Sequence, residues 1–300
     1  MDQTTLALQQ QLRDSMDDEI ATRIKDHQTR IASIRTATAN RLAAGARAPV
    51  TPLVMLAHGD SWFDYPLAGN SVSLPHTDII VQLESMGNVN PYILNMSQWG
   101  DATTDEMSLP KQQLMISALQ DPSNWLSSGK PDAILFSGGG NDVAGDQFCI
   151  FLDYSTLSPN GLDITRFQDA LGMVEASYLD LFAFRDRYAP GVPIFAHSYD
   201  FPIPNGAHPV CAGPWLKPSL DFCGYNLTEG TAIVRQALME FKNRLVALVG
   251  KPANNFILVD TQGVLQAADW ANELHPFPPG FQKLAGKFVD ALRSKFPGRI

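Results

Sequence analysis

The sequence contains few cysteines and few basic residues, and each shortage excludes a class of protein. Its three cysteines, Cys149, Cys211 and Cys223, form no CxxC pair and are too few for a disulfide scaffold or a structural zinc site. A bridge between Cys211 and Cys223 would require an oxidising compartment. The 22 lysines and arginines are outnumbered by 31 aspartates and glutamates, which gives a formal net charge of −9. We therefore expect no nucleic-acid partner, because binding to a phosphate backbone depends on clustered positive charge.

Long apolar runs and cofactor motifs are also missing. No stretch approaches the roughly 18 apolar residues that a membrane-spanning helix needs, so no span is expected. The first 19 residues are polar and acidic and lack the basic start and apolar stretch of a secretory signal, which predicts a cytoplasmic protein. There is no HExxH, dinucleotide or phosphate-loop motif, and the histidines at 58, 197 and 208 have no carboxylate partners at a metal-binding spacing. We expect neither a metal nor an organic cofactor.

The chain of 300 residues, 45% hydrophobic and 18% charged, is of a size and composition that suit one α/β domain with an appendage. We place an N-terminal helical extension at residues 1–48 and the main domain at 49–300. Residues 1–46 contain no proline. Their apolar residues recur at spacings of three, four and seven, as expected for an amphipathic helix: Leu8, Leu12, Met16, Ile20, Ile24, Ile31 and Ile34. Such an arm either packs on its own domain or forms a homo-oligomer through a coiled coil.

From residue 53 onward, short apolar runs alternate with longer helical patterns, which is typical of a parallel sheet with crossover helices. The apolar runs predict five strands, at 53–57, 92–96, 133–136, 192–196 and 256–260. Their nearly continuous hydrophobicity indicates strands that are covered on both faces. Helices are predicted over 164–188, 231–249 and 280–296.

Polar and glycine-rich segments follow the ends of these strands. They are His58-Gly-Asp-Ser-Trp62 after the first strand, Ser97-Gln-Trp-Gly-Asp101 after the second, and Ser137-Gly-Gly-Gly-Asn-Asp142 after the third. A fourth segment, Asp269-Trp-Ala-Asn-Glu-Leu-His-Pro276, lies between the fifth strand and the last helix. In an open parallel sheet the carboxyl ends of the strands are where functional groups gather. We therefore expect these segments to lie close together.

The four segments, in this order, resemble the four sequence blocks of the SGNH/GDSL hydrolase superfamily, over about residues 53–290. Each block alone is better explained by a helix cap, a flexible strand end or a surface histidine, but their joint occurrence favours the resemblance. The resemblance implies a three-layer α/β/α, flavodoxin-like fold with a mostly parallel five-stranded sheet. It also implies ester hydrolysis by an activated serine, although the superfamily includes lipases, thioesterases and acyltransferases as well.

The resemblance assigns roles to individual residues. Ser61 matches the family's nucleophile and His275 its base. The backbone N–H of Gly100, the side-chain amide of Asn141 and the backbone N–H of Ser61 match the donors of the oxyanion hole. A serine hydroxyl needs such a base before it becomes an effective nucleophile. The resemblance therefore implies a Ser-His site that forms an acyl-enzyme.

The sequence departs from the family's pattern three residues before His275. Family members usually have aspartate there, to orient the imidazole, whereas this chain has Asn272. Three arrangements remain open: Asp269 supplies the carboxylate, a backbone carbonyl near Asn272 holds the imidazole, or Glu273 reaches it. Asp269 is slightly favoured. The departure also leaves open a catalytically silent scaffold or binding protein.

The candidate substrate-binding residues are aromatic. Trp62 follows the nucleophile directly, while Phe201 and Trp215 lie in a long, proline-rich loop over residues 201–225. Loops of this length in compact domains are often functional. These rings either line a pocket for the small-molecule ester or fix their segments to the core. The sequence does not identify the acyl group or the alcohol.

Overall fold

The computed structural model describes residues 3–47, 49–65, 77–126, 128–208 and 213–300, with side chains from residue 18 onward. The central sheet has five parallel strands in the order β2-β1-β3-β6-β7. The strands are β1 (Val54–Gly59), β2 (Tyr92–Asn95), β3 (Ala133–Ser137), β6 (Ile194–His197) and β7 (Phe256–Val259). All five lie where the apolar runs predict them. The expected fold class, a three-layer α/β/α fold, is confirmed.

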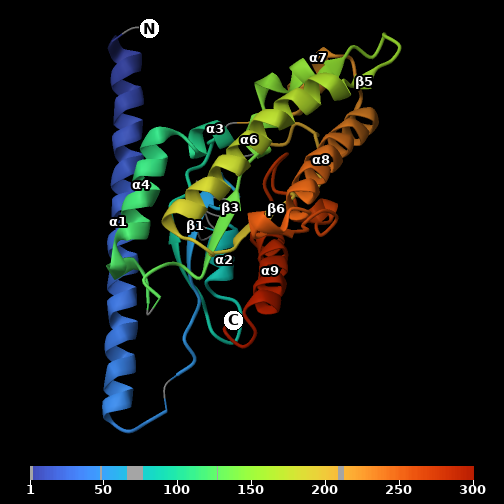
Figure 1. Ribbon diagram of the computed structural model, residues 1–300. Helices are drawn as coiled ribbons and strands as arrows, with labels where there is room; N and C mark the ends of the chain where they lie inside the picture. Colours follow the sequence, from blue (N-terminus) through green and yellow to red (C-terminus); the bar gives the residue numbers. More distant parts are fainter. Residues whose placement is uncertain (1–2, 48, 66–76, 127, 209–212) are drawn as a thin grey trace.

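Helices cover both faces of this sheet (Figure 1). Helix α2 (Ile79–Leu83) contacts α9 (Pro278–Lys295), while α6 (Ile164–Tyr188) contacts both α4 (Leu109–Gln120) and α8 (Leu227–Val249). The strands bury apolar side chains in both directions, as two ring contacts illustrate. Phe136 of β3 lies 5.1 Å from Tyr178 of α6, and Phe195 of β6 lies 6.4 Å from Phe296, just after α9.

Shorter elements lie at the carboxyl edge of the sheet. They comprise α3 (Thr103–Glu106), α5 (Gly140–Val143), α7 (Lys217–Phe222) and the antiparallel pair β4 (Leu152–Asp153) and β5 (Gly161–Leu162). Short 3-10 turns are η2 (Pro122–Asn124), η3 (Asp146–Phe151), η4 (Pro252–Asn254) and η5 (Ala267–Asp269). The register of the sheet pairs Gly59 with Ser137 and Ala57 with Asn95, so the segments after β1, β2 and β3 begin side by side.

The N-terminal arm is one helix, α1 (Gln3–Ala43), because no glycine or proline interrupts it. Within its described side chains, Ile20, His27 and Ile31 are buried against the chain's own domain. His27 Nε2 lies 2.9 Å from the carbonyl oxygen of Asn124. This part of the arm therefore packs within the molecule, beside α4 and the edge strand β2 (Figure 1). Oligomerisation through residues 1–46 stays a prediction.

Two expectations from the sequence, the pairing of Cys211 with Cys223 and the absence of a membrane-spanning helix, can be compared with the described residues only. Cys211 lies outside them, so its pairing with the buried Cys223 stays a prediction. In the ranges that the structure covers, no helix combines the length and the apolar character needed to cross a bilayer.

The packing of α1 predicts an unequal response to two substitutions on the same helix. Ile31 is fully buried, and Ile31→Ala should lower the free energy of unfolding by about 2 to 5 kcal/mol through lost burial and a cavity. Leu42 is 53% exposed, and Leu42→Ala should change the free energy of unfolding by less than about 0.5 kcal/mol. Denaturant titration of both variants measures the difference. Equal, small effects would contradict the intramolecular packing of α1.

Candidate active site

The predicted nucleophile lies in a tight turn that follows β1. Gly59 has φ 150°, and a Cβ there would lie only 2.4 Å from the carbonyl oxygen of Ser137, so the position requires glycine. The next residue, Asp60, is buried and accepts hydrogen bonds from Trp62 N–H (2.9 Å), Ser137 Oγ (2.6 Å) and Tyr199 Oη (2.5 Å). Burial raises the pKa of Asp60 to about 6. These three donors fix the turn that presents Ser61.

Ser61 and His275 meet although 214 positions separate them in the sequence. Ser61 Oγ lies 2.8 Å from His275 Nε2, and both residues are buried. Burial lowers the pKa of His275 to about 3, so the imidazole is neutral near pH 7. A neutral imidazole is the form that accepts a proton from a hydroxyl. The structure thus brings the two expected residues into the arrangement that serine activation needs.

Asn272 contacts this imidazole. Its Oδ1 lies 3.2 Å from His275 Nδ1 and also accepts the backbone N–H groups of Leu274 (2.9 Å) and His275 (2.8 Å). An amide oxygen only accepts hydrogen bonds, so Nδ1 carries the proton and Nε2 is left to accept one from Ser61. The opposite end of the amide donates to Tyr65 Oη at 3.2 Å. The Tyr65 ring packs 4.6 Å from the imidazole, a contact that the sequence did not reveal.

The two neighbouring carboxylates have other partners. Both oxygens of Asp269 bind Lys283 Nζ, at 2.8 and 2.7 Å, so the slight preference for Asp269 as the third member is corrected. Glu273 is fully buried and accepts four backbone N–H groups of the 201–225 loop, at 2.6 to 3.0 Å, from Gly206, Trp215, Leu216 and Lys217. Glu273 therefore joins this loop to the histidine segment.

Of the three predicted oxyanion donors, Ser61 and Asn141 border the same cavity, whereas Gly100 is not among the residues that line it. The Asn141 side chain lines one cavity with Ser61 and His275, and its Nδ2 donates to the carbonyl of Asp101 at 2.8 Å. An amide nitrogen has two protons, so one remains for a ligand. Among the described residues, the backbone N–H groups of Ser61 and Gly100 have no hydrogen-bond acceptor. Gly100 adopts φ 86°, in the left-handed region that favours glycine.

The triple glycine before Asn141 is needed for close packing. A Cβ on Gly138 would lie 2.3 Å from Glu106 Oε2, and one on Gly139 would lie 2.4 Å from the Phe241 ring. Gly139 also has φ 116°. This segment is therefore held against its neighbours, which fixes the start of α5 and the place of the Asn141 amide.

The cavity at Ser61 has a volume of about 60 Å³ and a mostly apolar wall. Asp200 is a charged residue of this wall, but its carboxylate is already bound by the backbone N–H groups of Phe201, Gly263 and Leu265, at 2.6 to 2.7 Å. The apolar wall comes from the segment after β3, from the 201–225 loop and from α8: Val143, Ala144, Phe148, Leu216, Val234, Ala237 and Leu238. Nothing in the sequence indicated that α8 borders the site, because its amphipathic pattern is that of an ordinary core helix.

The three predicted aromatic residues have different positions. Trp62 lines the cavity, and the Trp215 ring lies edge-on to the His275 imidazole at 5.6 Å. Phe201 instead lies beneath Arg235, 3.9 Å from the guanidinium carbon to the ring centre, and is not part of the cavity wall. His58 and His197 are buried, and their ring nitrogens have hydrogen-bond partners within the protein. The part of the chain that is described contains no cluster of side chains suited to a metal ion.

Comparison with known proteins places this fold among solved lipases. No protein-family model matches the sequence, and no curated protein matches it. The lipase Lip_vut3 from a goat rumen metagenome matches in structure with a TM-score of 0.53 at 16% identity, covering 80% of this chain and 97% of the lipase. An extracellular lipase from Streptomyces rimosus gives a TM-score of 0.49 at 16% identity, covering 80% and 98% of the two chains.

A putative GDSL-like lipase from Bacteroides ovatus is similar over 83% of this chain and 55% of its own, with a TM-score of 0.47 at 12% identity. Identities this low show the fold alone. The chain thus has the fold of a solved lipase.

Proposed function

We propose that this protein is a serine-dependent carboxylic-ester hydrolase. The observation that carries the proposal is the 2.8 Å contact between Ser61 Oγ and a buried, neutral His275 whose other nitrogen is held by Asn272. The contact lies in the wall of an apolar cavity, beside the Asn141 amide. Nucleophile, base, orienting group and oxyanion donor are then assembled around one position for a reacting carbonyl.

In the first half-reaction, Ser61 Oγ attacks the ester carbonyl carbon while its proton moves to His275 Nε2. The carbonyl oxygen becomes an oxyanion, which the N–H groups of Ser61 and Gly100 and the Asn141 amide stabilise. Each donor of this kind contributes on the order of 3 kcal/mol to transition-state stability. The carbon–oxygen bond to the alcohol then breaks, and the alcohol leaves with the proton from Nε2. An acyl group remains on Ser61.

In the second half-reaction, water replaces the alcohol. His275 Nε2 takes a proton from water as its oxygen attacks the acyl carbonyl, and the same three donors hold the oxyanion. The bond to Ser61 Oγ breaks, the proton returns to this oxygen and the carboxylic acid leaves. Asn272 keeps the Nδ1 proton in place throughout, so Nε2 alternates between base and acid.

The cavity points to a short, uncharged acyl group. Its volume is about 60 Å³, and a water-sized group needs roughly 10–15 Å³ on the same measure, which leaves room for a few heavy atoms. The Asp200 carboxylate is bound by backbone N–H groups, so no free charge faces a substrate from this residue. An acetyl, propionyl or butyryl ester therefore fits better than a long or charged acyl chain.

The first test is hydrolysis of p-nitrophenyl acetate by the wild type and three variants. Ser61→Ala and His275→Ala should each lower kcat by about 10⁴-fold or more, because loss of either member removes the covalent route. Asp269→Ala should stay within about twofold of the wild type, since this carboxylate pairs with Lys283 instead of the imidazole. An active Ser61→Ala variant would disprove the nucleophile, and an inactive wild type on all esters would favour a silent scaffold.

Variants of Asn272 test the orienting role and its dependence on pH. Asn272→Ala should lower kcat by about 10- to 100-fold through a misplaced imidazole. The wild-type kcat/KM should persist below pH 6, because the pKa of His275 is lowered to about 3 and the base is protonated only in stronger acid. Asn272→Asp adds a negative charge that stabilises the imidazolium, so its acid limb should move to higher pH. An unchanged acid limb in Asn272→Asp would argue against contact with His275.

The cavity wall predicts chain-length selectivity. Ala237 borders the cavity from α8, and Ala237→Leu should lower kcat/KM for the butyrate ester at least about tenfold more than for the acetate ester, since a filled pocket rejects the longer chain. The ratio of the two constants, measured beside the wild type, isolates selectivity from general loss of activity. An unchanged ratio would show that the acyl group binds elsewhere.

A further inference from the structure

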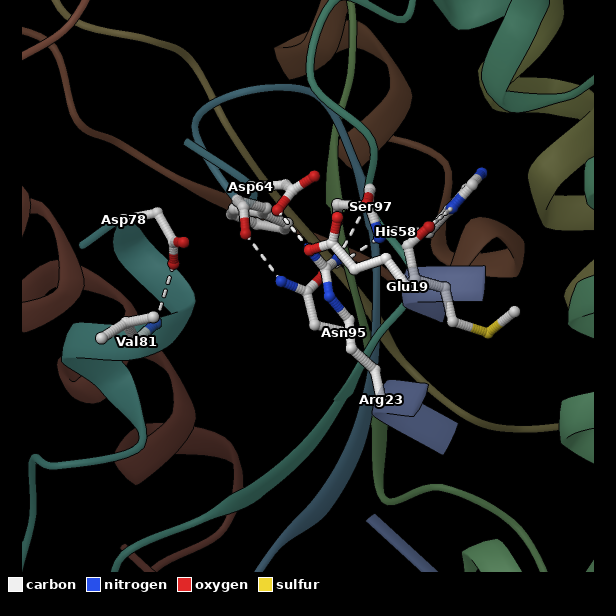
Figure 2. A network of polar contacts seen from close by, with 10 residues as sticks. Glu19, Arg23, His58, Asp64, Asp78, Val81, Asn95 and Ser97 are labelled. Atoms are coloured by element: carbon white, nitrogen blue, oxygen red, sulfur yellow. Dashed lines mark hydrogen bonds and ion pairs between the residues drawn. The ribbon is translucent and has the colours of Figure 1, made fainter. Parts of the chain in front are cut away.

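Arg23 of α1 reaches from the N-terminal helix to two of the three segments that carry the predicted oxyanion donors, those after β1 and β2 (Figure 2). Its Nη2 donates to Asp64 Oδ1 at 2.6 Å, and its Nη1 donates to the carbonyl oxygen of Ser97 at 3.1 Å. Nη2 also contacts Glu19, one turn earlier on α1, at 2.5 Å. One guanidinium therefore connects α1 with the segments after β1 and β2.

On the β1 side, Asp64 closes the turn that holds the nucleophile. It lies three positions after Ser61, and its backbone N–H donates to the carbonyl of Asp60 at 3.1 Å. The Asp64 side chain is only 8% exposed, so an unpaired carboxylate there would be costly. Burial raises the pKa of Asp64, and the charge of Arg23 opposes this rise and favours the ionised form.

On the β2 side, Ser97 lies three positions before Gly100. Its backbone N–H donates to Asn95 Oδ1 at 3.0 Å, and Asn95 Nδ2 donates to the carbonyl of Phe63 at 2.7 Å. The two segments are thus already joined to each other, and Arg23 adds a charged link to each. The N–H groups of Ser61 and Gly100 have to point at the same oxygen, so the relative placement of these segments sets the geometry of the oxyanion hole.

We propose that Arg23 is a positioning residue for the ester hydrolysis described above, acting by holding the Ser61 turn and the Gly100 segment in register from the N-terminal helix. The inference rests on the proposed function. Under this proposal, α1 contributes to the geometry of the active site as well as packing on the domain. The planar fork of arginine suits this task because it donates in several fixed directions at once, whereas lysine offers one compact charge.

The same helix provides a matched control. Arg30 also pairs with a carboxylate of the domain, Glu84, at 3.0 Å, and its guanidinium lies 5.2 Å from the Tyr92 ring. Neither contact involves the Ser61 turn or the Gly100 segment. Arg30→Ala therefore removes an arginine link between α1 and the domain without touching the predicted donors.

The experiment compares wild type, Arg23→Ala, Arg23→Lys and Arg30→Ala in the full chain. It measures kcat and KM for p-nitrophenyl acetate, the rate at which a fluorophosphonate modifies the serine, and the folded fraction by circular dichroism. Arg23→Ala should lose about 10- to 100-fold in kcat and in the modification rate with little change in KM, because displaced donors weaken the transition state more than substrate binding. Arg23→Lys should recover part of this loss, and Arg30→Ala should stay within about twofold of the wild type.

The contrary outcomes are distinct. Equal activities of folded Arg23→Ala and Arg30→Ala, or a loss in Arg23→Ala that follows only its unfolded fraction, would overturn the positioning role and leave the hydrolase proposal standing. A wild type that neither cleaves esters nor reacts with the fluorophosphonate would overturn the proposed function itself, and the role of Arg23 with it.

Discussion

The hydrogen bond between Ser61 and His275 requires an imidazole that is buried, neutral and held in one tautomer. Burial supplies the neutral state by lowering the pKa of His275 to about 3, and Asn272 supplies the tautomer by accepting at Nδ1. A charged aspartate at position 272 would favour the imidazolium more strongly. The uncharged Asn272 amide stabilises the imidazolium less than an aspartate would, but it still contacts His275 Nδ1. The proposed mechanism thus relies on the orientation of the histidine and on the predicted oxyanion donors more than on a full negative charge beside the histidine.

A network of buried polar side chains lies beside Ser61 and holds the turn that contains it. Asp60 binds Ser137 and Tyr199, and Ser137 Oγ in turn lies 2.8 Å from His197 Nε2. Such a network is favourable only when every member has its hydrogen-bond partners, and then it specifies a single arrangement.

Glu106 lacks such partners among the described residues. It is fully buried, burial raises its pKa well above the ordinary value, and neither of its carboxyl oxygens has a hydrogen-bond partner in the part of the chain that the structure covers. Its protonated form is the one that fits this place against Gly138.

The sequence predicted what depends on local pattern and failed where long-range packing decides. The five strands and the assembly of Ser61, His275 and Asn141 at one edge follow from apolar runs and from the parallel order of the strands. The choice between Asp269 and Asn272 did not follow, because both lie near His275 in sequence and only the path of the chain sends Asp269 to Lys283. The roles of α8 and Arg23 were equally hidden. An amphipathic helix shows which face is apolar, but not which part of the domain that face meets.

The most direct test of this account is the crystal structure of the protein after reaction with a short-chain alkyl fluorophosphonate. The account predicts phosphorus bonded to Ser61 Oγ, with the phosphoryl oxygen within hydrogen-bond distance of Ser61 N–H, Gly100 N–H and Asn141 Nδ2. Its alkyl group should occupy the cavity bordered by Ala237. Phosphorus on a different side chain, or a phosphoryl oxygen turned away from these three donors, would contradict the account.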